Sequence, residues 1–523
     1  MNREQLVAPE KYNIVSEFEK YANGTELKAL IHINAKGEKN EISYDKLMAL
    51  SNRAANVFKE NGLQKGDVVL VMVPRLIEAY VTYIGALKAG LVVIPSSEML
   101  RSADIDYRLV HSNANAVVSY DAFSSQFEEV ENMEGIHHFV IGKALKGQLP
   151  LMELMEGASE TFDASETNSS DIAFLSYTSG TTGAPKGVVH THAWGYAHLR
   201  TTGAKWLGIE EEDVVWATAA PGWQKWIWTP FLSVLGSGAT GLVYDGGFNV
   251  KTYFELIKEN KVNVLCCTPT EYRFMGTEEN LKQYDLSSIR SAVSAGEPLN
   301  REIIAVFKNN FSLDVRDGYG QTESTLLVGT MLGMDAKIGS MGKPTPGNRV
   351  EIINDNGEIA PVGEIGDIAV HKSTPALFKE YLNDPERTSM QFRGEYFVTG
   401  DRAKMDEDGY FWFEGRGDDI IVSSGYTIGP FEVEDALLQH AAVRECAVVA
   451  SPDPVRGNIV KAFIVLKDSK RKNEETLIKE LQDHVKKLTA PYKYPRKIEF
   501  IDELQKTVSG KIMRFELRKK EQQ

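Results

Sequence analysis

The chain has 523 residues, of which 42% are hydrophobic and 25% are charged. This composition is typical of soluble globular enzymes and excludes collagen-like, mucin-like and largely disordered chains. The net charge of −15 disfavours nucleic acid and anionic membranes as partners. No apolar run reaches the roughly 18–20 residues that span a bilayer. The charged N-terminus lacks the apolar core of a signal peptide, and the chain has only three cysteines. We therefore expect a protein of the reducing cytoplasm with about two to four structural units.

The N-terminal half of the chain predicts alternating helices and strands. Apolar residues at near-helical spacing predict a helix from residue 43 to Asn61-Gly62, and the run GDVVLVMVP at 66–74 predicts a strand buried on both faces. Residues 78–95 repeat the pattern of helix, glycine and strand, and residues 254–269 repeat it again. Such alternation is typical of an α/β fold with a mainly parallel sheet.

The charge of the chain changes sign near residue 415. Residues 1–418 carry a net charge of −18, whereas residues 419–523 contain 19 basic and 16 acidic side chains. Between them lies GRGDD at 415–419, a glycine-flanked stretch that could serve as a linker. One continuous fold that ends in a solvated basic helix would have the same composition. We interpret the change as a large acidic domain followed by a small C-terminal domain.

The strongest local signal is YTSGTTGAPKG at residues 177–187, which follows a predicted strand at 171–177. Its three glycines free the backbone to surround an anion with N–H groups, its hydroxyl residues add donors, and Lys186 adds a positive charge. The loop differs from a Walker A motif, because Lys186 lies between proline and glycine. A flexible surface loop is the alternative, and the density of hydroxyl groups beside the lysine disfavours it.

This string resembles the signature loop of the adenylate-forming superfamily, which contains acyl-CoA synthetases, adenylation domains of peptide synthetases, and luciferases. Further segments that resemble its motifs follow in the family's order: SAGEPL (294–299), DGYGQTE (317–323), TGD (399–401), GRGDD (415–419), SGY (424–426) and TVSGK (507–511). The resemblance implies an α/β fold with a large N-terminal domain of layered sheets (1–415), a hinge (416–418) and a small mobile α+β domain (419–523). It also implies activation of a carboxylate by ATP, with Mg²⁺ as the cofactor.

The resemblance carries the family's ATP site onto named residues. The β- and γ-phosphates would be held by Thr178, Ser179, Gly180, Thr181, Thr182, Gly183, Ala184, Pro185 and Lys186. Thr322 would donate to the α-phosphate and Glu323 would bind Mg²⁺, for which a carboxylate oxygen is a suitable ligand. Adenine and ribose would contact Gly296, Glu297, Pro298, Asp317, Gly318, Tyr319, Gly320, Gln321, Asp401 and Arg416. Considered alone, Asp401 and Arg416 would more often form a surface ion pair.

Two residues near the C-terminal domain are assigned roles by the resemblance. Lys511 would reach the acyl carboxylate and the α-phosphate, although a solvated lysine is the default among so many basic neighbours. Gln505 stands where the family usually has proline. Asp418 would be the hinge about which the small domain rotates between half-reactions.

The acyl pocket and the CoA site are also inferred from the resemblance. Trp223, Trp226 and Trp228 lie in GWQKWIW, and residues 221–240 resemble medium-chain acyl-CoA synthetases more than acetyl-CoA synthetases. Closely spaced aromatics usually belong to a core, but the family usually places an aromatic residue near this point at the mouth of the acyl pocket, so we assign Trp223 to that pocket. CoA would contact Ser424, Gly425, Tyr426, Arg456, Tyr494, Pro495 and Arg496. Thr427 replaces an arginine that is usual in the medium-chain group, which puts the geometry near the phosphate or acyl group in doubt.

We therefore predict a monomeric or homodimeric acyl-CoA synthetase that converts an acid, ATP and CoA into acyl-CoA, AMP and pyrophosphate. Short- to medium-chain or branched fatty acids are the favoured substrates, and aryl acids such as benzoate come next. A related enzyme that loads a carrier protein is an alternative, whereas an oxygenase resembling luciferase and a silent nucleotide sensor are less favoured. The Cys266-Cys267 and His137-His138 pairs and the His190/His192 spacing are interpreted as structural.

Overall fold

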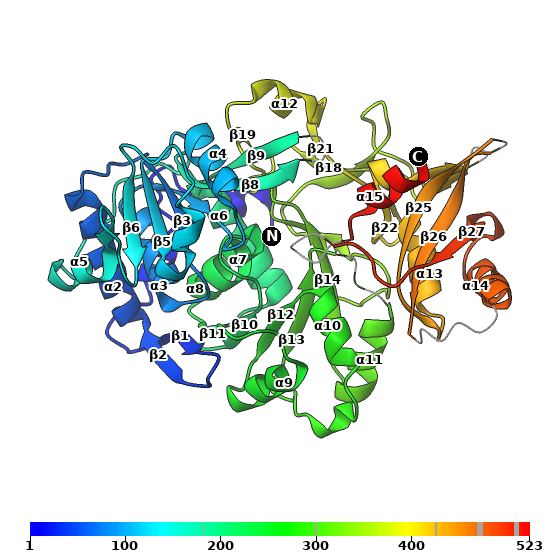
Figure 1. The fold of residues 1–523 in the computed structure, drawn as a ribbon, viewed down its shortest axis with the longest axis horizontal. Coiled ribbons are helices and arrows are strands. Elements are labelled where there is room, and N and C mark those ends of the chain that lie inside the picture. Colours follow the sequence, from blue (N-terminus) through cyan, green and yellow to red (C-terminus); the bar gives the residue numbers. More distant parts are fainter. Residues whose placement is uncertain are drawn as a thin grey trace.

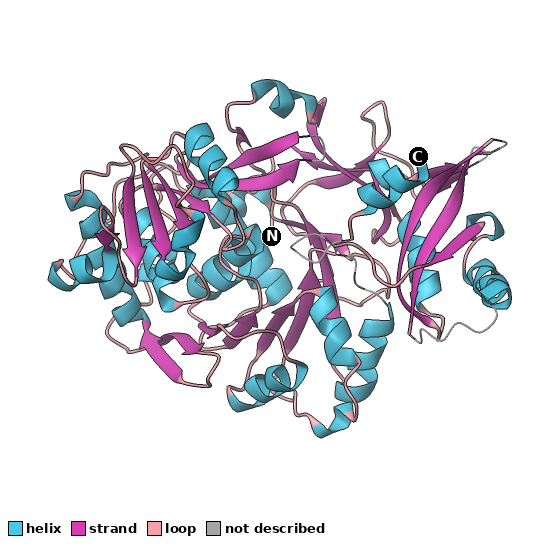
Figure 2. Cartoon of the chain, in the orientation of Figure 1, coloured by secondary structure: helices cyan, strands magenta, loops and turns pink. Residues whose placement is uncertain are grey.

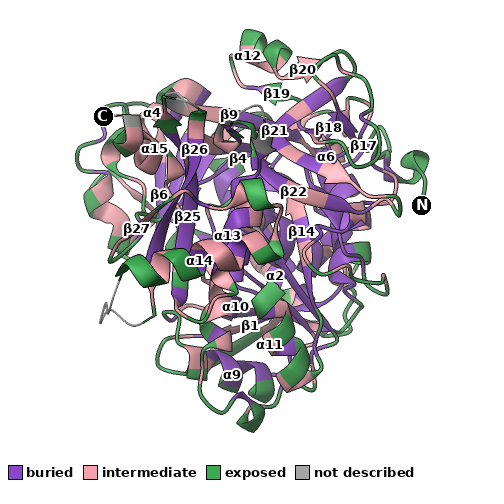
Figure 3. Cartoon of the chain, turned by 90° about the vertical axis from the view of Figure 1, so that its right-hand side faces the viewer, coloured by how far each residue is buried: buried purple, intermediate pink, exposed green. Residues whose placement is uncertain are grey.

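A computed structural model describes residues 1–180, 183–297, 299, 301–423, 426–454, 456–467, 474–506 and 512–522. Three sheets and their helices form the larger part of the molecule, and the elements after residue 419 form a smaller body at its side (Figures 1 and 2). The strands are largely buried, while helices such as α9 and α11 turn one face to solvent (Figure 3). No helix within the described ranges is long and apolar enough to cross a membrane.

The first sheet contains eight strands and is mainly parallel. Its order is β19 (Glu380–Tyr381), β9 (Gly183–Thr191), β8 (Ile172–Gly180), β4 (Val92–Pro95), β3 (Val68–Met72), β5 (Ala116–Tyr120), β6 (His137–Ile141) and β7 (Leu149–Pro150). Strands β8, β9 and β19 pair antiparallel at one edge. Its neighbouring helices are α2 (Tyr44–Glu60), α3 (Ile77–Lys88), α4 (Ser102–Ser112) and α5 (Leu151–Gly157).

The second sheet contains nine strands, and the six in its middle are parallel. Its order is β16 (Lys343–Pro344), β15 (Leu326–Gly329), β14 (Val315–Gly320), β13 (Ser291–Ala295), β12 (Val264–Cys267), β10 (Val214–Ala217), β11 (Thr240–Tyr244), β1 (Lys28–Ile33) and β2 (Lys39–Ser43). The helices that follow its strands are α9 (Val250–Glu259), α10 (Pro269–Gly276) and α11 (Arg301–Phe311). Side chains of α9, α10 and α11 and of the sheet form one apolar cluster.

A helical layer lies between these two sheets (Figure 1). It consists of α6 (His192–His198), the π-helical segments Leu199–Leu207 and Ile227–Ser233, α7 (Gln224–Trp226) and α8 (Val234–Gly236). The core cluster on the side of the first sheet joins α2, α3 and β8 to this layer through residues such as Phe174, Trp194, Trp226 and Phe231. The remaining short helices are Arg3–Leu6, α1 (Ser16–Glu19), Asp121–Gln126 and Leu281–Gln283.

The third sheet is antiparallel and leads into the C-terminal elements. It contains β17 (Val350–Ile353), β18 (Gly366–His371), β21 (Tyr396–Met405), β20 (Phe392–Arg393) and β22 (Phe411–Arg416), and α12 (Pro385–Met390) lies beside it. The C-terminal elements are Gly417–Asp419, β23 (Ile421–Ser423), β24 (Tyr426–Ile428), α13 (Pro430–Leu438), β25 (Val443–Asp453), β26 (Gly457–Leu466), α14 (Glu474–Leu488), Pro491–Lys493, β27 (Lys497–Phe500) and α15 (Arg514–Gln522). Arg514 donates to the buried Glu434, which ties α15 to α13.

Polar contacts join the C-terminal elements to the larger body. Arg301 lies 3.3 Å from the Asp435 carboxylate, and Arg273 lies 4.0 Å from that of Glu445. At the junction, Gly415 has a φ of +145°, a conformation that favours glycine, and a Cβ there would lie 2.9 Å from Pro430. The chain therefore needs glycine where it leaves the third sheet.

The predicted α/β architecture is confirmed. The helix expected from residue 43 is α2, and the run at 66–74 contains β3. Residues 78–95 form most of α3 and then β4, and residues 254–269 contain the end of α9 and then β12. The difference lies at residues 177–187, where the sequence predicted one strand and a loop. The structure has two antiparallel strands, with Thr178 opposite Lys186.

We expect Gly85→Ala to destabilise the protein, because α2 and α3 are in contact at this glycine. A Cβ on Gly85 would lie 2.7 Å from the Ala54 Cβ and 2.9 Å from the Ser51 carbonyl oxygen. Such overpacking typically costs about 1–3 kcal/mol, which urea unfolding followed by tryptophan fluorescence would show as a lower midpoint. Gly157→Ala is the matched control, because it also lies in a helix and its Cβ would meet open space. Equal midpoints for the two variants would contradict the packing argument.

Candidate active site

The carboxyl ends of the parallel strands of the second sheet bring several of the predicted residues to one edge. Gly296 and Glu297 follow β13, and Gln321–Glu323 follow β14. The chain passes from β10 to its neighbour β11 and then returns across β10 to β12, so the direction of strand addition reverses there. Ligands of open α/β sheets bind at such switch points. The edge that carries these residues is therefore the place expected for a ligand.

The predicted phosphate loop is the tip of the β8–β9 hairpin, where Gly180 pairs with Gly183. The Oγ1 atom of Thr178 is buried and has no hydrogen-bond partner within the described residues, which leaves its hydroxyl available to a ligand. Of Ser179, Gly180, Gly183 and Ala184 the backbone alone is described, and Thr181 and Thr182 lie outside the described residues. Pro185 accepts a hydrogen bond from the Tyr107 hydroxyl through its carbonyl oxygen.

The side chains of Lys186 and Glu323 face each other across the site. The Nζ atom of Lys186 lies 2.6 Å from Oε1 of Glu323, and the Tyr381 hydroxyl contacts both groups. Glu323 is only 7% exposed, whereas the neighbouring Thr322 is half-buried. Burial, together with the charge of Glu323, raises the pKa of Tyr381 well above its usual value. A buried carboxylate beside the hairpin cation is the arrangement expected for a site that binds metal and phosphate.

The residues fit a magnesium ion that is shared with phosphate groups. The described residues contain no group of three or more His, Cys, Asp or Glu side chains that could hold a metal by themselves. Mg²⁺ is usually bound by one or two carboxylates together with substrate phosphates, so Glu323 alone is a sufficient protein ligand of this kind. The unpartnered Thr178 hydroxyl and the Lys186 ammonium are suited to the phosphate side.

A second group of predicted residues surrounds Asp401. Its Oδ2 atom accepts hydrogen bonds from the Tyr319 hydroxyl and from Nε2 of Gln321, both at 2.6 Å. Arg416 lies 3.8 Å from its other oxygen. Asp401 and Arg416 do form the ion pair that the alternative interpretation predicted. However, this is not a surface ion pair, because Asp401 is only 7% exposed and its hydrogen bonds extend to β14. These four side chains therefore form one polar cluster.

The glycines of the 317–323 segment have a packing role. A Cβ on Gly320 would lie 2.2 Å from the Thr325 carbonyl oxygen, and one on Gly318 would lie 2.5 Å from the Trp206 ring. Between them, Tyr319 is half-buried. The lack of side chains at 318 and 320 thus lets β14 lie close to its neighbours, which positions Tyr319.

Asp317 begins this segment and has an unusual protonation equilibrium. Its carboxylate accepts a hydrogen bond from the Gly318 N–H at 2.8 Å. Burial raises its pKa to about 7, and the nearby Lys225 ammonium opposes this only in part. Lys225 also donates to the Ala295 carbonyl oxygen at 2.5 Å. The segment after β10 is thereby tied to the end of β13.

Of the three clustered tryptophans, one is exposed and two are buried. Trp223 is 38% exposed and precedes α7, whereas Trp226 and Trp228 are buried. Trp226 packs against Tyr83 and stacks on Phe231, with ring centroids 4.8 and 5.3 Å away. Trp223 is thus the member of the cluster that is open to a ligand.

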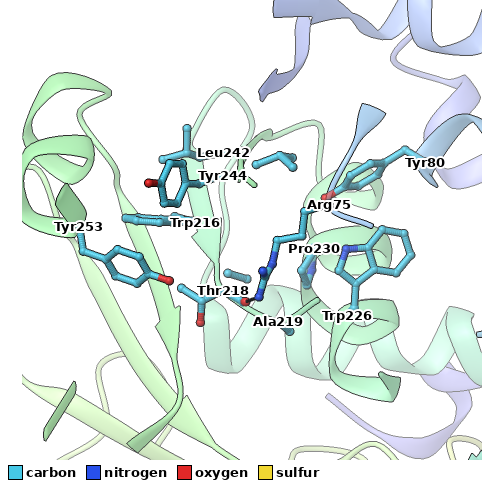
Figure 4. A pocket seen from close by; sticks show the side chains of 12 residues that line it. Arg75, Tyr80, Trp216, Thr218, Ala219, Trp226, Pro230, Leu242, Tyr244 and Tyr253 are labelled. Carbon is cyan, nitrogen blue, oxygen red and sulfur yellow. Dashed lines mark hydrogen bonds between the residues drawn. The ribbon is translucent and has the colours of Figure 1, made fainter. Parts of the chain in front are cut away.

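A cleft that the sequence did not predict lies between the first two sheets (Figure 4). Arg75, from the loop after β3, extends into it and donates to the Thr218 carbonyl oxygen at 3.0 Å. Five of the residues that line it are aromatic and come from parts of the chain far apart in the sequence: Tyr80, Trp216, Trp226, Tyr244 and Tyr253. Because these residues share no local pattern, sequence reasoning had no signal for the cleft.

The predicted CoA residues are described only in part. Ser424 and Gly425 lie outside the described residues, and of Tyr426 the backbone alone is described. Arg456 is exposed beside the β25–β26 turn. Arg496 donates to the Tyr494 hydroxyl at 2.8 Å, Pro495 between them is buried, and the Arg496 N–H donates to the Val460 carbonyl oxygen at 2.8 Å. This places Arg496 toward the same end of the C-terminal sheet as Arg456.

Three further predicted residues lie outside the described residues or are described only in part. Lys511 and Pro298 are outside the described residues, and of Asp418 the backbone alone is described, in the short helix Gly417–Asp419. Lys506 and Ile512, on either side of residues 507–511, form an antiparallel bridge. Of the residues interpreted as structural, His137 is half-buried, and the others are buried: Cys266, Cys267, His138, His190 and His192.

Comparison with known proteins identifies the class. The model of the AMP-binding enzyme family matches residues 18–382, and that of the AMP-binding enzyme C-terminal domain matches residues 432–511. The acyl-CoA ligase YtcI of Bacillus subtilis (strain 168) is 57% identical, over 100% of this chain and 98% of its own. The mitochondrial acyl-coenzyme A synthetase ACSM3 of Rattus norvegicus is 43% identical, over 94% of this chain and 86% of its own.

A solved structure has the same architecture. The anthranilate CoA ligase AuaEII, solved in complex with anthranoyl-AMP, superimposes with a TM-score of 0.91 at 30% identity, over 100% of this chain and 99% of its own. The chain belongs to the adenylate-forming AMP-binding enzyme family, in which it lies near the medium-chain acyl-CoA synthetases.

We expect Asp317→Asn to change how stability depends on pH. The folded protein binds the Asp317 proton more tightly than an unfolded chain with the ordinary pKa of 3.8, so wild-type stability falls as the pH rises toward about 7. The variant lacks this loss, and its free energy of unfolding relative to wild type should rise by on the order of 2 kcal/mol between pH 5 and pH 8. Urea unfolding at both pH values would measure it. Asp355→Asn, at an exposed position, is the control, and a difference independent of pH would refute the expectation.

Proposed function

We propose that this ATP-dependent acyl-CoA synthetase, an AMP-forming acid–thiol ligase, activates short- to medium-chain or branched fatty acids. The observation that carries the proposal is the meeting of Lys186, Glu323 and the Asp401 cluster, which Gln321 and Glu323 at the end of β14 join to one another. The attack of a carboxylate on phosphorus requires that the two groups be held in position and that the developing negative charge be neutralised. These side chains supply both. The 43% identity with the medium-chain synthetase ACSM3 supports the choice of acids.

In the first half-reaction, a substrate carboxylate oxygen attacks the α-phosphorus of ATP and pyrophosphate leaves. Lys186 and the backbone of the hairpin tip would hold the β- and γ-phosphates, with Thr178 as a further donor. Thr322 would donate to the α-phosphate. Glu323 would hold Mg²⁺, which when bound neutralises phosphate charge. Asp401 would accept from the ribose hydroxyls, and the ring of Tyr319 would lie along adenine.

In the second half-reaction, the CoA sulfur attacks the acyl carbonyl carbon and AMP leaves. We propose that Arg456 and Arg496 contact the phosphates of CoA. The two arginines lie toward one end of a domain whose net charge is slightly positive, and such a charge favours an anionic ligand. Ser424, Gly425 and Tyr426 would line the path of the pantetheine arm. Thr427 leaves that segment without the usual cation, so the acid preference could differ from that of the medium-chain group.

The two half-reactions need different groups from the C-terminal domain at the same carbonyl. We propose the domain boundaries 1–415 and 419–523, with residues 416–418 as the hinge and Asp418 as its pivot. The positive φ of Gly415 and the short helix that follows support a change of direction at this point. Rotation about it would exchange Lys511 for the CoA segment.

An aryl-CoA ligase is the second candidate. The similarity to the anthranilate CoA ligase AuaEII favours it, because that structure superimposes over the whole chain. An enzyme that loads a carrier protein is a further alternative, which free CoA would distinguish by discharging the adenylate. We propose a cytoplasmic location and a monomer or homodimer as the working form.

The proposed function is tested by CoA-dependent release of AMP, measured across acids of two to twelve carbons with branched and aromatic members. We expect medium-chain or branched acids to be used best. Lys511→Ala should lower ATP–pyrophosphate exchange by about 10²–10³-fold, since one preorganised cation is lost, yet it should still form acyl-CoA from supplied acyl-AMP. A wild type that exchanges pyrophosphate with none of these acids would refute the proposal. Equal losses in both half-reactions would refute the role of Lys511.

We expect Trp223→Ala to change which acids are used more than it changes ATP affinity. A larger pocket should raise the relative use of bulkier acids by about tenfold, because a methylene-sized contact is worth roughly 1–3 kcal/mol. The readout is kcat/KM for a series of acids together with the KM for ATP. Trp412→Ala, which removes a half-buried tryptophan from β22, is the control. An unchanged acid profile with a lower thermal midpoint would show that Trp223 stabilises the fold and does not select the acid.

A further inference from the structure

We propose that Tyr381 is a positioning residue that holds the Glu323 carboxylate in place while Lys186 is exchanged for a magnesium ion. The inference rests on the proposed function, in which Glu323 holds Mg²⁺ and Lys186 holds phosphate. Tyr381 belongs to none of the motifs by which the family was recognised in the sequence.

The geometry is a closed triangle of three polar groups. The Tyr381 hydroxyl donates to Oε1 of Glu323 at 2.8 Å and accepts from Nζ of Lys186, also at 2.8 Å. The Lys186 Nζ atom lies 2.6 Å from the same carboxylate oxygen and 4.4 Å from the centroid of the tyrosine ring. One hydroxyl group thus satisfies both charged partners at once.

The backbone around Tyr381 fixes this triangle from two directions. Strand β19 pairs antiparallel with β9, with Tyr381 opposite Val188, so the tyrosine is joined to the strand that carries Lys186. Three residues earlier, the N–H of Phe378 donates to the carbonyl oxygen of Glu323 at 2.7 Å. Tyr381 itself is 2% exposed. A short segment therefore holds the main chain of both charged residues.

The charges explain why such a residue is needed. Glu323 is buried, so it needs a positive partner at all times. Without nucleotide that partner is Lys186. When nucleotide binds, Lys186 would turn to the phosphates. The Mg²⁺ that accompanies the nucleotide would then replace Lys186 as the positive partner of Glu323. During this exchange the Tyr381 hydroxyl would stay on Oε1 of Glu323 and would hold the carboxylate in place for the ion.

A positioning role and a structural role predict different results for Tyr381→Phe. The variant removes one oxygen and keeps the ring, while the β19–β9 pairing uses backbone groups, so we expect it to fold. Partners that orient a metal ligand typically contribute 10–100-fold to metal affinity. A purely structural role would lower the thermal midpoint and leave the dependence on Mg²⁺ unchanged.

The test is calorimetric binding of ATP in the presence of Mg²⁺ and in excess chelator. For wild type we expect Mg²⁺ to strengthen ATP binding, and for Tyr381→Phe we expect that strengthening to fall by about 10–100-fold, with chelated ATP bound as in wild type. Tyr44→Phe is the matched control, because it removes another buried hydroxyl that donates to main-chain oxygens, away from the site. The Mg²⁺ midpoint of pyrophosphate exchange should shift in the same direction.

The outcomes separate the two proposals. If Tyr381→Phe binds ATP with the same Mg²⁺ dependence as wild type and Tyr44→Phe, the positioning role is wrong and the proposed function stands. If chelated ATP also binds more weakly to Tyr381→Phe, by the same factor, the hydroxyl acts on the nucleotide and the inference is likewise overturned. If the wild type itself binds no ATP under either condition, the proposed function fails, and this inference with it.

Discussion

The pairing of Lys186 with Glu323 is the interaction on which the rest of the site depends. The lysine comes from a hairpin of the first sheet and the glutamate from the loop between β14 and β15 of the second. A buried carboxylate without a cation costs several kcal/mol, so this pair favours the arrangement in which the two sheets meet at this point. The same meeting brings the hairpin close to the edge that carries Tyr319, whose hydroxyl donates to Asp401 of the third sheet.

Much of the fold could be predicted because its signals are local. The helical spacing of Leu47, Ala54, Ala55 and Phe58 marks the buried face of α2, and the uninterrupted apolar run of β3 reflects burial on both sides of a parallel sheet. In the structure, Glu323, Asp401 and Arg416, which were each named from a different motif, lie beside residues of other motifs. The residues of each motif are consecutive in the sequence, so a motif can be recognised without knowledge of the tertiary structure.

The rest could not be predicted because it depends on contacts between distant segments. Strand β9 contains two glycines and a proline, which disfavour a strand, yet pairing with β8 and β19 overrides that preference. Arg75 contacts a main-chain oxygen that lies 143 residues away, and such a partner leaves no side-chain signal. Tyr381 acts through its hydroxyl on residues from two other segments, and a lone tyrosine in the sequence is indistinguishable from a core residue.

The junction with the C-terminal elements has a consequence for how the molecule responds to its surroundings. Its contacts include the ion pairs of Arg301 with Asp435 and of Arg273 with Glu445. Ion pairs near a surface contribute about 0–1 kcal/mol each and are screened by dissolved salt, whose Debye length is about 8 Å at physiological ionic strength. An apolar interface would be nearly indifferent to such screening. We therefore expect the docking of the small domain to weaken as the ionic strength rises, and the rotation that we propose between half-reactions would respond to the salt content of the medium in the same way.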